Sequence, residues 1–518
     1  MAEVVNNNNI PEIPVEKFTM VGDSRSLHDQ KFDTKPVGYL HDAFRRFCKN
    51  KASVVAAIII LLLLLFSIFA PIFSPYTVQY NNSVMSKKLP KARGLEWLGW
   101  DGCQKVSISA TDYWQYMAIA EETGNEVVKK TYRQYEVVTM LGSLKLTDVW
   151  YDAYIDTYTL DGLKYVTLTE AEYTALQKYQ DDNNVQIIYP FIPEGTGLDQ
   201  YNANRWYAVY TSGANKGLPV GINLETGEVE WQNVYEKYNG SDAYTSKMRV
   251  EGEGNKLYSY AERKQANNYE IRVSYYDYYQ YLYGHEPTFL FGTDQYGKDI
   301  FTRLAAGARF SLLFAIAVSV INLTIGAIYG AIEGYYGGAA DMIMERISDI
   351  LSGVPFMVVV TLFKLHILEH VGAVVTLLFA YVTTGWIGMA STVRMQFYRF
   401  KNQEYVLAAR TLGAGDWRVM WKHVFPNSLG TIVTSCVLVI PGVIFGESSL
   451  SYLGILNLES GSTTSVGTLM ANGQGQLGTA PHIILFPALF IALLMISFNL
   501  FGNGLRDAFN PSLRGSEG

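Results

Sequence analysis

Residues 404–427 read EYVLAARTLGAGDWRVMWKHVFPN, and this short basic stretch decides how the rest of the chain is interpreted. It lies between two apolar segments that are each long enough to cross a bilayer. A connector rich in Arg and Lys between two spans belongs on the cytoplasmic side of a membrane. Ala408 and Ala409 stand in a helix-favouring run, Gly413 permits a turn, and Pro426 sets the start of the next span. The pattern predicts two helices joined by a tight bend, here called the elbow, which another protein can grip closely.

The elbow resembles the EAA loop of the permease subunits of ABC importers, in which Glu-Ala-Ala, a glycine and a Leu-Pro pair recur at fixed spacing. Ala408, Ala409, Gly413 and Pro426 fall on that register. The resemblance implies that the elbow docks on an ATPase subunit and transmits ATP-driven closure to a pore. The alternative is an ordinary basic loop that follows the positive-inside bias. The resemblance assigns ATPase coupling to Glu404, Ala408, Ala409, Arg410, Gly413, Ala414, Asp416 and Pro426.

Three positions of the elbow depart from the family pattern. Leu407 stands where the family has Glu, Phe425 stands where it has Leu, and His423 takes a position that is often Ile. Leu407 removes any polar contact that the Glu makes, but it leaves the geometry unchanged. Glu404, three residues earlier, is the candidate to replace that carboxylate.

Composition excludes several classes of protein. The 518 residues are too many for one ordinary domain. The mean hydropathy of +0.06 averages two unlike parts, because the apolar residues are gathered into runs and the middle third is polar. The net charge of -7 argues against a nucleic-acid partner. Cys48, Cys103 and Cys436 are scattered, and they predict neither a disulfide framework nor a metal site.

The N-terminal part predicts a tail and a first span. Residues 52–73 carry no charge and are long enough to cross about 30 Å of hydrocarbon. The basic residues ahead of this run keep the N-terminus in the cytoplasm. A secretory signal peptide is excluded, because the polar region ahead is too long and no small-residue cleavage site follows. Residues 1–51 form a cytoplasmic tail, in which 41–51 is either an amphipathic segment at the inner membrane surface or a disordered basic stretch.

Residues 76–290 predict an extracytoplasmic insertion with α+β structure. Its apolar runs are short, and acidic residues outnumber basic ones. Strand-like alternation recurs with turn signals between the segments, and Thr169 and Glu172 are placed as a capping box. The many tyrosines are either a recognition surface or filler of a strand-rich domain. The predicted strands include 185–189, 206–210, 218–223 and 270–276, and the predicted helices are 111–122 and 169–179.

Residues 292–299, GTDQYGKD, nearly match a phosphate-binding loop. Asp299 stands where that loop needs Ser or Thr, and its charge would repel phosphate, so we reject a nucleotide site. The longer string 292–312, GTDQYGKDIFTRLAAGARFSL, resembles a segment before the second span of permeases of the dipeptide and oligopeptide branch, with Lys for Arg and Thr for Ser at one position each. Asp299 and Arg303 are one helical turn apart, which predicts an ion pair.

Five further apolar runs predict the remaining spans. The third contains Pro355, and the fifth is broken by Pro441 and Gly442. Five glycines within residues 326–338 let helices approach closely. Odd spans run outward and even spans inward, which places residues 391–427 and both termini in the cytoplasm without use of the family. These spans are about 310–329, 350–368, 371–390, 429–445 and 483–500.

Two features at the membrane leave alternatives open. Glu447 either lines a transport pathway or forms a structural hydrogen bond between helices. His366 and His370 have the i, i+4 spacing of a zinc pair. No third ligand is evident, however, and polar anchors at the outer membrane boundary are the better account.

Residues 498–511, FNLFGNGLRDAFNP, resemble the C-terminal signature of the same permeases. The resemblance therefore extends over roughly 1–75 and 285–515, and it is strongest to the C-type subunits of oligopeptide permeases. It implies a multi-pass α-helical membrane protein with six spans, the type I ABC importer permease fold, and an inserted α+β domain at 76–290. Residues 291–518 then form a permease core with five transmembrane helices, the elbow and a cytoplasmic C-terminus.

The resemblance implies one transmembrane subunit of an ATP-driven peptide importer in the cell membrane, which forms half of the translocation pathway. This chain would catalyse no reaction and hold no cofactor, because ATP and magnesium bind to partner subunits. The implied partners are a second, B-type permease, two ABC ATPase subunits, an extracytoplasmic peptide-binding protein, the peptide and the lipid bilayer. We expect residues 76–290 to dock the binding protein. The rival hypothesis is a membrane-anchored receptor or enzyme whose function lies in 76–290, although one span would suffice for an anchor.

Overall fold

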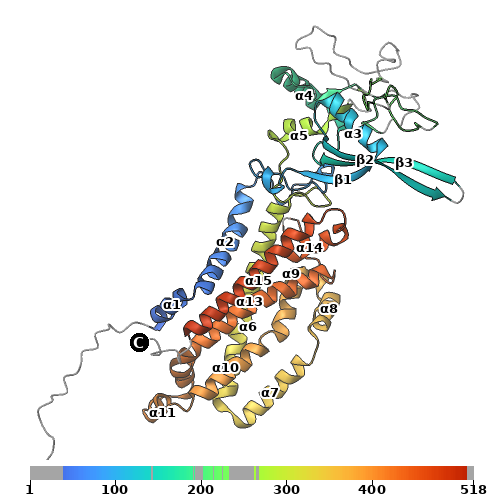
Figure 1. The fold of residues 1–518 in the computed structure, drawn as a ribbon. Coiled ribbons are helices and arrows are strands. Elements are labelled where there is room, and N and C mark those ends of the chain that lie inside the picture. Colours follow the sequence, from blue (N-terminus) through green and yellow to red (C-terminus); the bar gives the residue numbers. More distant parts are fainter. Residues whose placement is uncertain are drawn as a thin grey trace, which may run out of the picture.

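The computed structural model describes residues 39–141, 144–190, 192, 202–213, 215–223, 226–232, 262–263, 268–461 and 463–509. Within them the chain forms a bundle of long helices that carries an insertion at one end (Figure 1). The elbow lies at the opposite end of the bundle. We call these two ends the insertion end and the elbow end.

The described residues contain five helical segments that are long and apolar enough to cross a membrane. A sixth crossing is present if α7 (Gly338–Ser352) and α8 (Phe356–His366), which are bent by 73°, count as one span. The chain is therefore a multi-pass helical membrane protein. The five segments are α2 (Lys51–Phe73), α6 (Ile300–Tyr336), α9 and α10 together (Leu368–Phe400), α12 to α13 (Asp416–Tyr452) and α15 (His482–Phe509).

Three spans differ from the sequence-based prediction. α6 begins well before residue 310, because Asp299 caps it and accepts the backbone N–H of Thr302 at 2.9 Å. The third span is not one helix, since the chain bends ahead of α8 where Pro355 cannot continue the helical hydrogen bonds. The predicted break at Pro441 is wrong: α13 (Phe425–Tyr452) runs through it, as membrane helices tolerate proline where their neighbours satisfy the backbone.

The N-terminal helix α1 (Tyr39–Lys49) is amphipathic, as the first alternative for residues 41–51 expects, and it ends two residues before that range does. Ala43 and Phe47 are buried, whereas Phe44 is 66% exposed. Phe47 meets Phe501 of α15 edge to face, with 5.3 Å between the ring centroids. α1 therefore lies at the elbow end, against the last turns of α15 (Figure 1).

α6 packs closely on α10 (Ile387–Phe400) through glycines spaced four residues apart. A Cβ atom on Gly330 would lie 2.1 Å from the carbonyl oxygen of Ala390. Cβ atoms on Gly326 and Gly334 would lie 2.7 Å from other backbone oxygens of the facing segment. No side chain fits at these distances, so the contact depends on glycine at all three positions.

The insertion contains two antiparallel sheets, in the orders β1-β3-β2 and β4-β7-β5, with β6 paired to β7. β1 (Cys103–Ser109) pairs with residues 150–156 of β3 (Leu144–Asp156). β2 (Val128–Leu141) and β3 continue past β1 as a two-stranded ribbon, which projects from the rest of the insertion (Figure 1). The other elements are β4 (Leu163–Leu168), β5 (Ile188–Tyr189), β6 (Glu262–Arg263), β7 (Tyr269–Ser274), α3 (Ala110–Thr123), α4 (Glu170–Asn183) and α5 (Tyr275–Tyr283).

The predicted elements of the insertion are present in part. Both predicted helices are confirmed as α3 and α4, and α4 begins with the predicted capping box of Thr169 and Glu172. The strand at 270–276 corresponds to β7. The segments 206–210 and 218–223 form isolated bridges instead of strands, one between Val209 and Pro219 and one from Ile222 to Val229. The core uses tyrosine as filler, because many tyrosines here are buried. These are Tyr76, Tyr151, Tyr158, Tyr173, Tyr189, Tyr207, Tyr269, Tyr275, Tyr278 and Tyr279.

A buried arginine joins the parts of the insertion. Arg272 on β7 is fully buried and donates two hydrogen bonds to the carboxylate of Glu122 on α3, at 2.7 and 2.5 Å. It also donates to the carbonyl oxygens of Ala203 at 2.7 Å and Pro190 at 2.9 Å. Because each guanidinium nitrogen has an acceptor and the charge is paired with Glu122, this charge is compatible with complete burial.

The glycine contact can be tested by adding a side chain to it. Gly330→Leu should force α6 and α10 apart and cost about 1–3 kcal/mol of stability. Gly388→Leu is the matched control, because Gly388 lies on α10 and a Cβ there would meet nothing within 4 Å. Thermal unfolding of the purified protein in detergent should show a lower midpoint for Gly330→Leu alone. Equal midpoints for the two variants would contradict the packing described.

Candidate functional site

The elbow consists of two short helices around a glycine turn. Gly413 has φ of 85°, in the left-handed region where glycine is strongly preferred. Its N–H donates to the carbonyl of Arg410 at 2.9 Å, and the N–H of Ala414 donates to the carbonyl of Ala409 at 3.0 Å. These bonds end the first helix and reverse the chain. The elements in order are α11 (Glu404–Thr411), α12 (Asp416–Arg418), a π-helical turn (Val419–Val424) and α13 (Phe425–Tyr452).

One face of the elbow packs on the bundle. Val406, Val419 and Val424 are fully buried. They belong to the apolar cluster that includes Phe397 of α10 and Tyr335 of α6. The elbow is therefore seated on the ends of α6 and α10 by its own apolar side chains.

The opposite face of the elbow presents large apolar side chains to the exterior. Leu412, beside the glycine turn, is 89% exposed, and Trp417 is 65% exposed. Leu407 and Tyr405 are 48% and 40% exposed. A group of exposed apolar side chains on a tight bend is typical of a docking surface.

The predicted coupling residues divide between the two faces. Ala409 is buried and Ala414 is half-buried. The exposed ones are Glu404, Ala408, Arg410, Gly413, Asp416 and Pro426. Leu412 and Trp417 were not predicted as functional residues. A leucine and a tryptophan in a short basic connector could have indicated an exposed apolar surface.

The end of α6 holds both sides of the elbow turn. The hydroxyl of Tyr335 donates to Asp416 Oδ1 at 2.5 Å, and the guanidinium of Arg410 lies 5.0 Å from the centroid of the Tyr335 ring. Lys401 Nζ donates to the carbonyl oxygen of Gly334 at 2.8 Å. Lys401 therefore satisfies the last carbonyls of α6, where a cation is favoured. None of these contacts was predicted from the sequence.

A second polar cluster at the elbow end fixes α7 to α10. Arg394 makes paired hydrogen bonds to Asp341, at 2.6 and 3.0 Å, and to Glu345, at 2.8 and 3.0 Å. The hydroxyl of Tyr398 also donates to Asp341, at 2.5 Å. Bidentate pairs of this kind are among the stronger polar contacts in proteins.

Glu447 lies in the interior of this subunit. Its side chain is fully buried on α13. Ser311 of α6 donates to Oε2 at 3.0 Å, and Ser451 donates to Oε1 at 3.1 Å. The alternative of a structural hydrogen bond between helices accounts for these contacts, since serine donors on α6 and α13 satisfy both carboxylate oxygens.

A buried ion-pair cluster lies at the insertion end. Arg303, in the first turns of α6, donates to Asp294 at 2.6 Å and to Glu459 at 2.5 Å, and Lys298 donates to Glu459 at 3.1 Å. Burial opposes the charged form of Glu459, but Arg303 and Lys298 outweigh it and hold the pKa of Glu459 below its usual value. The predicted pair of Asp299 with Arg303 is wrong, because Asp299 turns back to cap α6.

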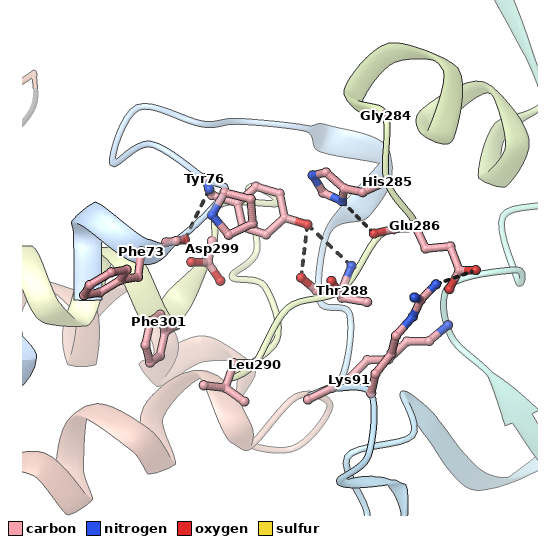
Figure 2. Close-up of a pocket in the computed structure, with 14 residues that line it drawn as sticks. Phe73, Tyr76, Lys91, Gly284, His285, Glu286, Thr288, Leu290, Asp299 and Phe301 are labelled. Atoms are coloured by element: carbon pink, nitrogen blue, oxygen red, sulfur yellow. Dashed lines mark hydrogen bonds and ion pairs between the residues drawn. The ribbon is translucent and has the colours of Figure 1, made fainter. Parts of the chain in front are cut away.

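A pocket of about 790 Å³ opens where the bundle meets the insertion (Figure 2). Phe73 and Phe301 line its bundle side. Tyr76 lies between them and His285, and its hydroxyl donates to the carbonyl oxygen of Thr288 at 3.0 Å. The pocket combines an apolar wall with polar groups, among which Arg93 pairs with Glu286.

The two histidines considered as a zinc pair do not share one helix face. α8 ends at His366 and α9 (Leu368–Thr384) begins two residues later, with Ile367 at the break between them. The i, i+4 spacing therefore does not bring the rings together as it would within one helix. In the part of the chain that the structure describes, no three His, Cys, Asp or Glu residues are grouped to hold a metal ion.

Two family profiles match this sequence. The profile described as binding-protein-dependent transport system inner membrane component matches residues 322–515. The profile described as N-terminal TM domain of oligopeptide transport permease C matches residues 38–90. Both matches fall on the helical bundle and its N-terminal approach, and most of the insertion lies between them.

Three curated relatives each match this chain over 224 or 225 residues. The oligopeptide transport system permease protein OppC of Bacillus subtilis is 45% identical over 224 residues, which cover 43% of this chain and 72% of the relative. The dipeptide transport system permease protein DppC of the same organism is 42% identical over 225 residues, or 43% of this chain and 69% of the relative. The OppC protein of Escherichia coli K12 is 36% identical, with the same share of this chain and 72% of its own length.

Substitutions at Glu447 separate the hydrogen-bonding role from a need for charge. Glu447→Gln keeps an acceptor for Ser311 and should leave the thermal midpoint nearly unchanged. Glu447→Leu leaves buried serine hydroxyls without this partner and should cost about 1–3 kcal/mol. Thermal unfolding in detergent measures both variants. A midpoint for Glu447→Gln as low as that of Glu447→Leu would show that the charge itself is required.

Proposed function

This chain belongs to the family of binding-protein-dependent transport system inner membrane components, and we propose that it is one permease subunit of an ATP-driven peptide importer. The observation that carries the proposal is the elbow. Its register matches the EAA loop, and it presents Leu412 and Trp417 outward from a rigid base. The names of these relatives, which are oligopeptide and dipeptide transport permeases, supply the substrate class.

We propose that the elbow end is cytoplasmic and the insertion end is extracytoplasmic. The basic helix α1 packs against the last turns of α15, and the elbow lies at the same end of the bundle (Figure 1). Short loops that are rich in Lys and Arg and connect two transmembrane helices are usually found on the cytoplasmic side. Both described ends of the chain would then be cytoplasmic, and the two sheets of the insertion would lie outside.

The proposed assembly contains this chain, a B-type permease, two ABC ATPases and an extracytoplasmic peptide-binding protein. ATP and magnesium would bind to the ATPases, and this chain would contribute no reacting group. ATP binding would draw the ATPases together and displace the elbow. Such a displacement favours one state of the pathway only if the contacts of the elbow differ between the two states.

The exposed side chains of the elbow give this docking a physical basis. Leu412 and Trp417 are the most exposed large apolar side chains of the elbow. Complete burial of a leucine side chain contributes about 1.5–3 kcal/mol. Tryptophan is among the residues that are enriched in binding hot spots. The ATPase would therefore need an apolar cleft that accepts both side chains.

A bulky residue at the turn should uncouple the elbow from its partner. Gly413→Trp forces a non-glycine residue into the left-handed region and adds an indole at the apex. Peptide uptake by cells should be abolished while the protein stays in the membrane. Asn402→Trp is the control, because Asn402 is exposed at the same end but precedes the elbow. Normal uptake with Gly413→Trp would refute the proposal that the elbow couples this chain to an ATPase.

We also propose that the ribbon of β2 and β3 docks the peptide-binding protein. The pairs from Glu136–Val149 to Leu141–Leu144 extend past the last pair of β1, Ser109–Trp150. A two-stranded ribbon is marginally stable in water on its own, so a partner that covers it would stabilise it.

A shortened ribbon tests this docking without removal of the domain. Residues 136–149 can be replaced by Asn-Gly, which makes a two-residue turn between the paired Tyr135 and Trp150. Capture of the binding protein by the purified complex should fall, while the amount of assembled complex stays the same. Unchanged capture would refute docking by the ribbon.

A further inference from the structure

One continuous helix connects the two ends of the bundle. The 37 residues of α6 (Ile300–Tyr336) correspond to about 55 Å of helix. Arg303, near its first turn, belongs to the ion-pair cluster at the insertion end. Tyr335, in its last turn, contacts the elbow. The elbow and the opposite end of the bundle are therefore joined through a single element (Figure 1).

Tyr335 contacts the elbow on both sides of its turn. Its hydroxyl donates to Asp416, which begins α12 after the turn. Its ring lies under the guanidinium of Arg410, at the end of α11 before the turn. The Tyr335 side chain itself is 5% exposed, so the surrounding atoms hold it in place. A displacement of the elbow must therefore move Tyr335 or break these contacts.

The last turns of α6 are also packed against the helix that leads into the elbow. Gly326, Gly330 and Gly334 bring its backbone against α10 at distances that exclude any side chain. Lys401 follows α10 and donates to carbonyl oxygens of Gly334 and Tyr335, at 2.8 and 3.3 Å. Packed rigid elements of this kind carry coupling between distant sites.

The far end of α6 contacts a connector that follows a different helix, α13, in the chain. Arg303 donates to Glu459 at 2.5 Å. Glu459 lies in the connector between α13 and α14 (Val466–Gly473), and α13 starts inside the elbow. A shift of α6 relative to α13 therefore changes the Arg303–Glu459 contact at the insertion end.

We propose that Tyr335 is a positioning residue for coupling: it transfers displacement of the elbow to α6, and α6 carries the displacement to the contact of Arg303 with Glu459. This inference rests on the proposed function. Tyr335 would contact neither peptide nor nucleotide. The ion-pair cluster at the insertion end would be the last contact to which the displacement is transmitted.

The test measures peptide taken up per ATP hydrolysed by the complete complex in liposomes. Tyr335→Phe removes the hydroxyl that binds Asp416 and keeps the ring beneath Arg410. Uptake per ATP should fall at least about fivefold, as expected for loss of a hydrogen bond to a charged group, while ATP hydrolysis stays within about twofold. Tyr336→Phe is the matched control on the same turn, because Tyr336 is 54% exposed. The Tyr336→Phe complex should take up as much peptide per ATP hydrolysed as the unchanged complex.

A double variant tests whether the hydroxyl acts through Asp416. In a complex that carries Asp416→Ala, the further change of Tyr335→Phe should have no additional effect on the ratio, because the same bond is already absent. A further loss of similar size would show that Tyr335 acts independently of Asp416 and would overturn the proposed path.

A label at the far end tests transmission through α6. Thr463→Cys places an exposed thiol near Arg303 and Glu459, in a chain whose Cys48, Cys103 and Cys436 are replaced by Ser. Labelling by a membrane-impermeant maleimide should change at least about threefold between nucleotide-free complex and complex trapped with ATP and vanadate. Tyr335→Phe should abolish this change.

The outcomes separate the inference from the function on which it rests. No ATP-dependent uptake by the unchanged complex would refute the proposed function itself. Normal uptake by that complex together with a normal ratio for Tyr335→Phe would overturn only the role of Tyr335. A parallel loss of uptake, ATP hydrolysis and thermal midpoint in Tyr335→Phe would also overturn it, because a purely structural residue behaves in that way.

Discussion

The contact between the backbones of α6 and α10 is the constraint on which the position of the elbow depends. Gly326, Gly330 and Gly334 allow an approach that no larger residue permits. α10 leads into the elbow, and the apolar face of the elbow then packs on the ends of both helices. Without that contact, α11 would have no fixed base, and Leu412 and Trp417 would not be presented in one orientation.

Ion pairs and buried hydrogen bonds join helices and connectors in addition to the apolar contacts. An unpaired charge at membrane depth or in a protein interior is costly. Arg394 at the elbow end forms ion pairs with three carboxylates, and Arg303 at the insertion end forms ion pairs with two. Glu447 accepts hydrogen bonds from serines on α6 and on α13. Each of these groups joins segments that are distant in the sequence. The polar contacts thus hold these helices and connectors to one another.

Local patterns predicted the helical bundle and the shape of the elbow. Long apolar runs, and a glycine shortly after two alanines, are signals that need no tertiary information. α3 and α4 were both predicted, and the start of α4 was recognised from its capping box. Contacts between distant residues were not predictable. Tyr335 and Asp416 are 81 residues apart, and Arg394 and Asp341 are 53 apart. Asp299 was assigned the wrong partner, because spacing does not distinguish an i, i+4 ion pair from a helix cap. The extended sheet β1-β3-β2 was missed, since its long hairpin is rich in charged and polar residues on both strands.

We propose that the elbow is held against a separate ATPase subunit on the cytoplasmic side. A photo-crosslinking amino acid at Trp417, in complexes assembled in intact cells, tests this contact, because the Trp417 side chain is 65% exposed on the elbow. We expect a covalent adduct with an ATPase subunit whose yield depends on ATP. The absence of any adduct with an ATPase, or the reaction of a thiol placed there with an impermeant reagent added outside the cell, would contradict docking of the elbow on a cytoplasmic ATPase.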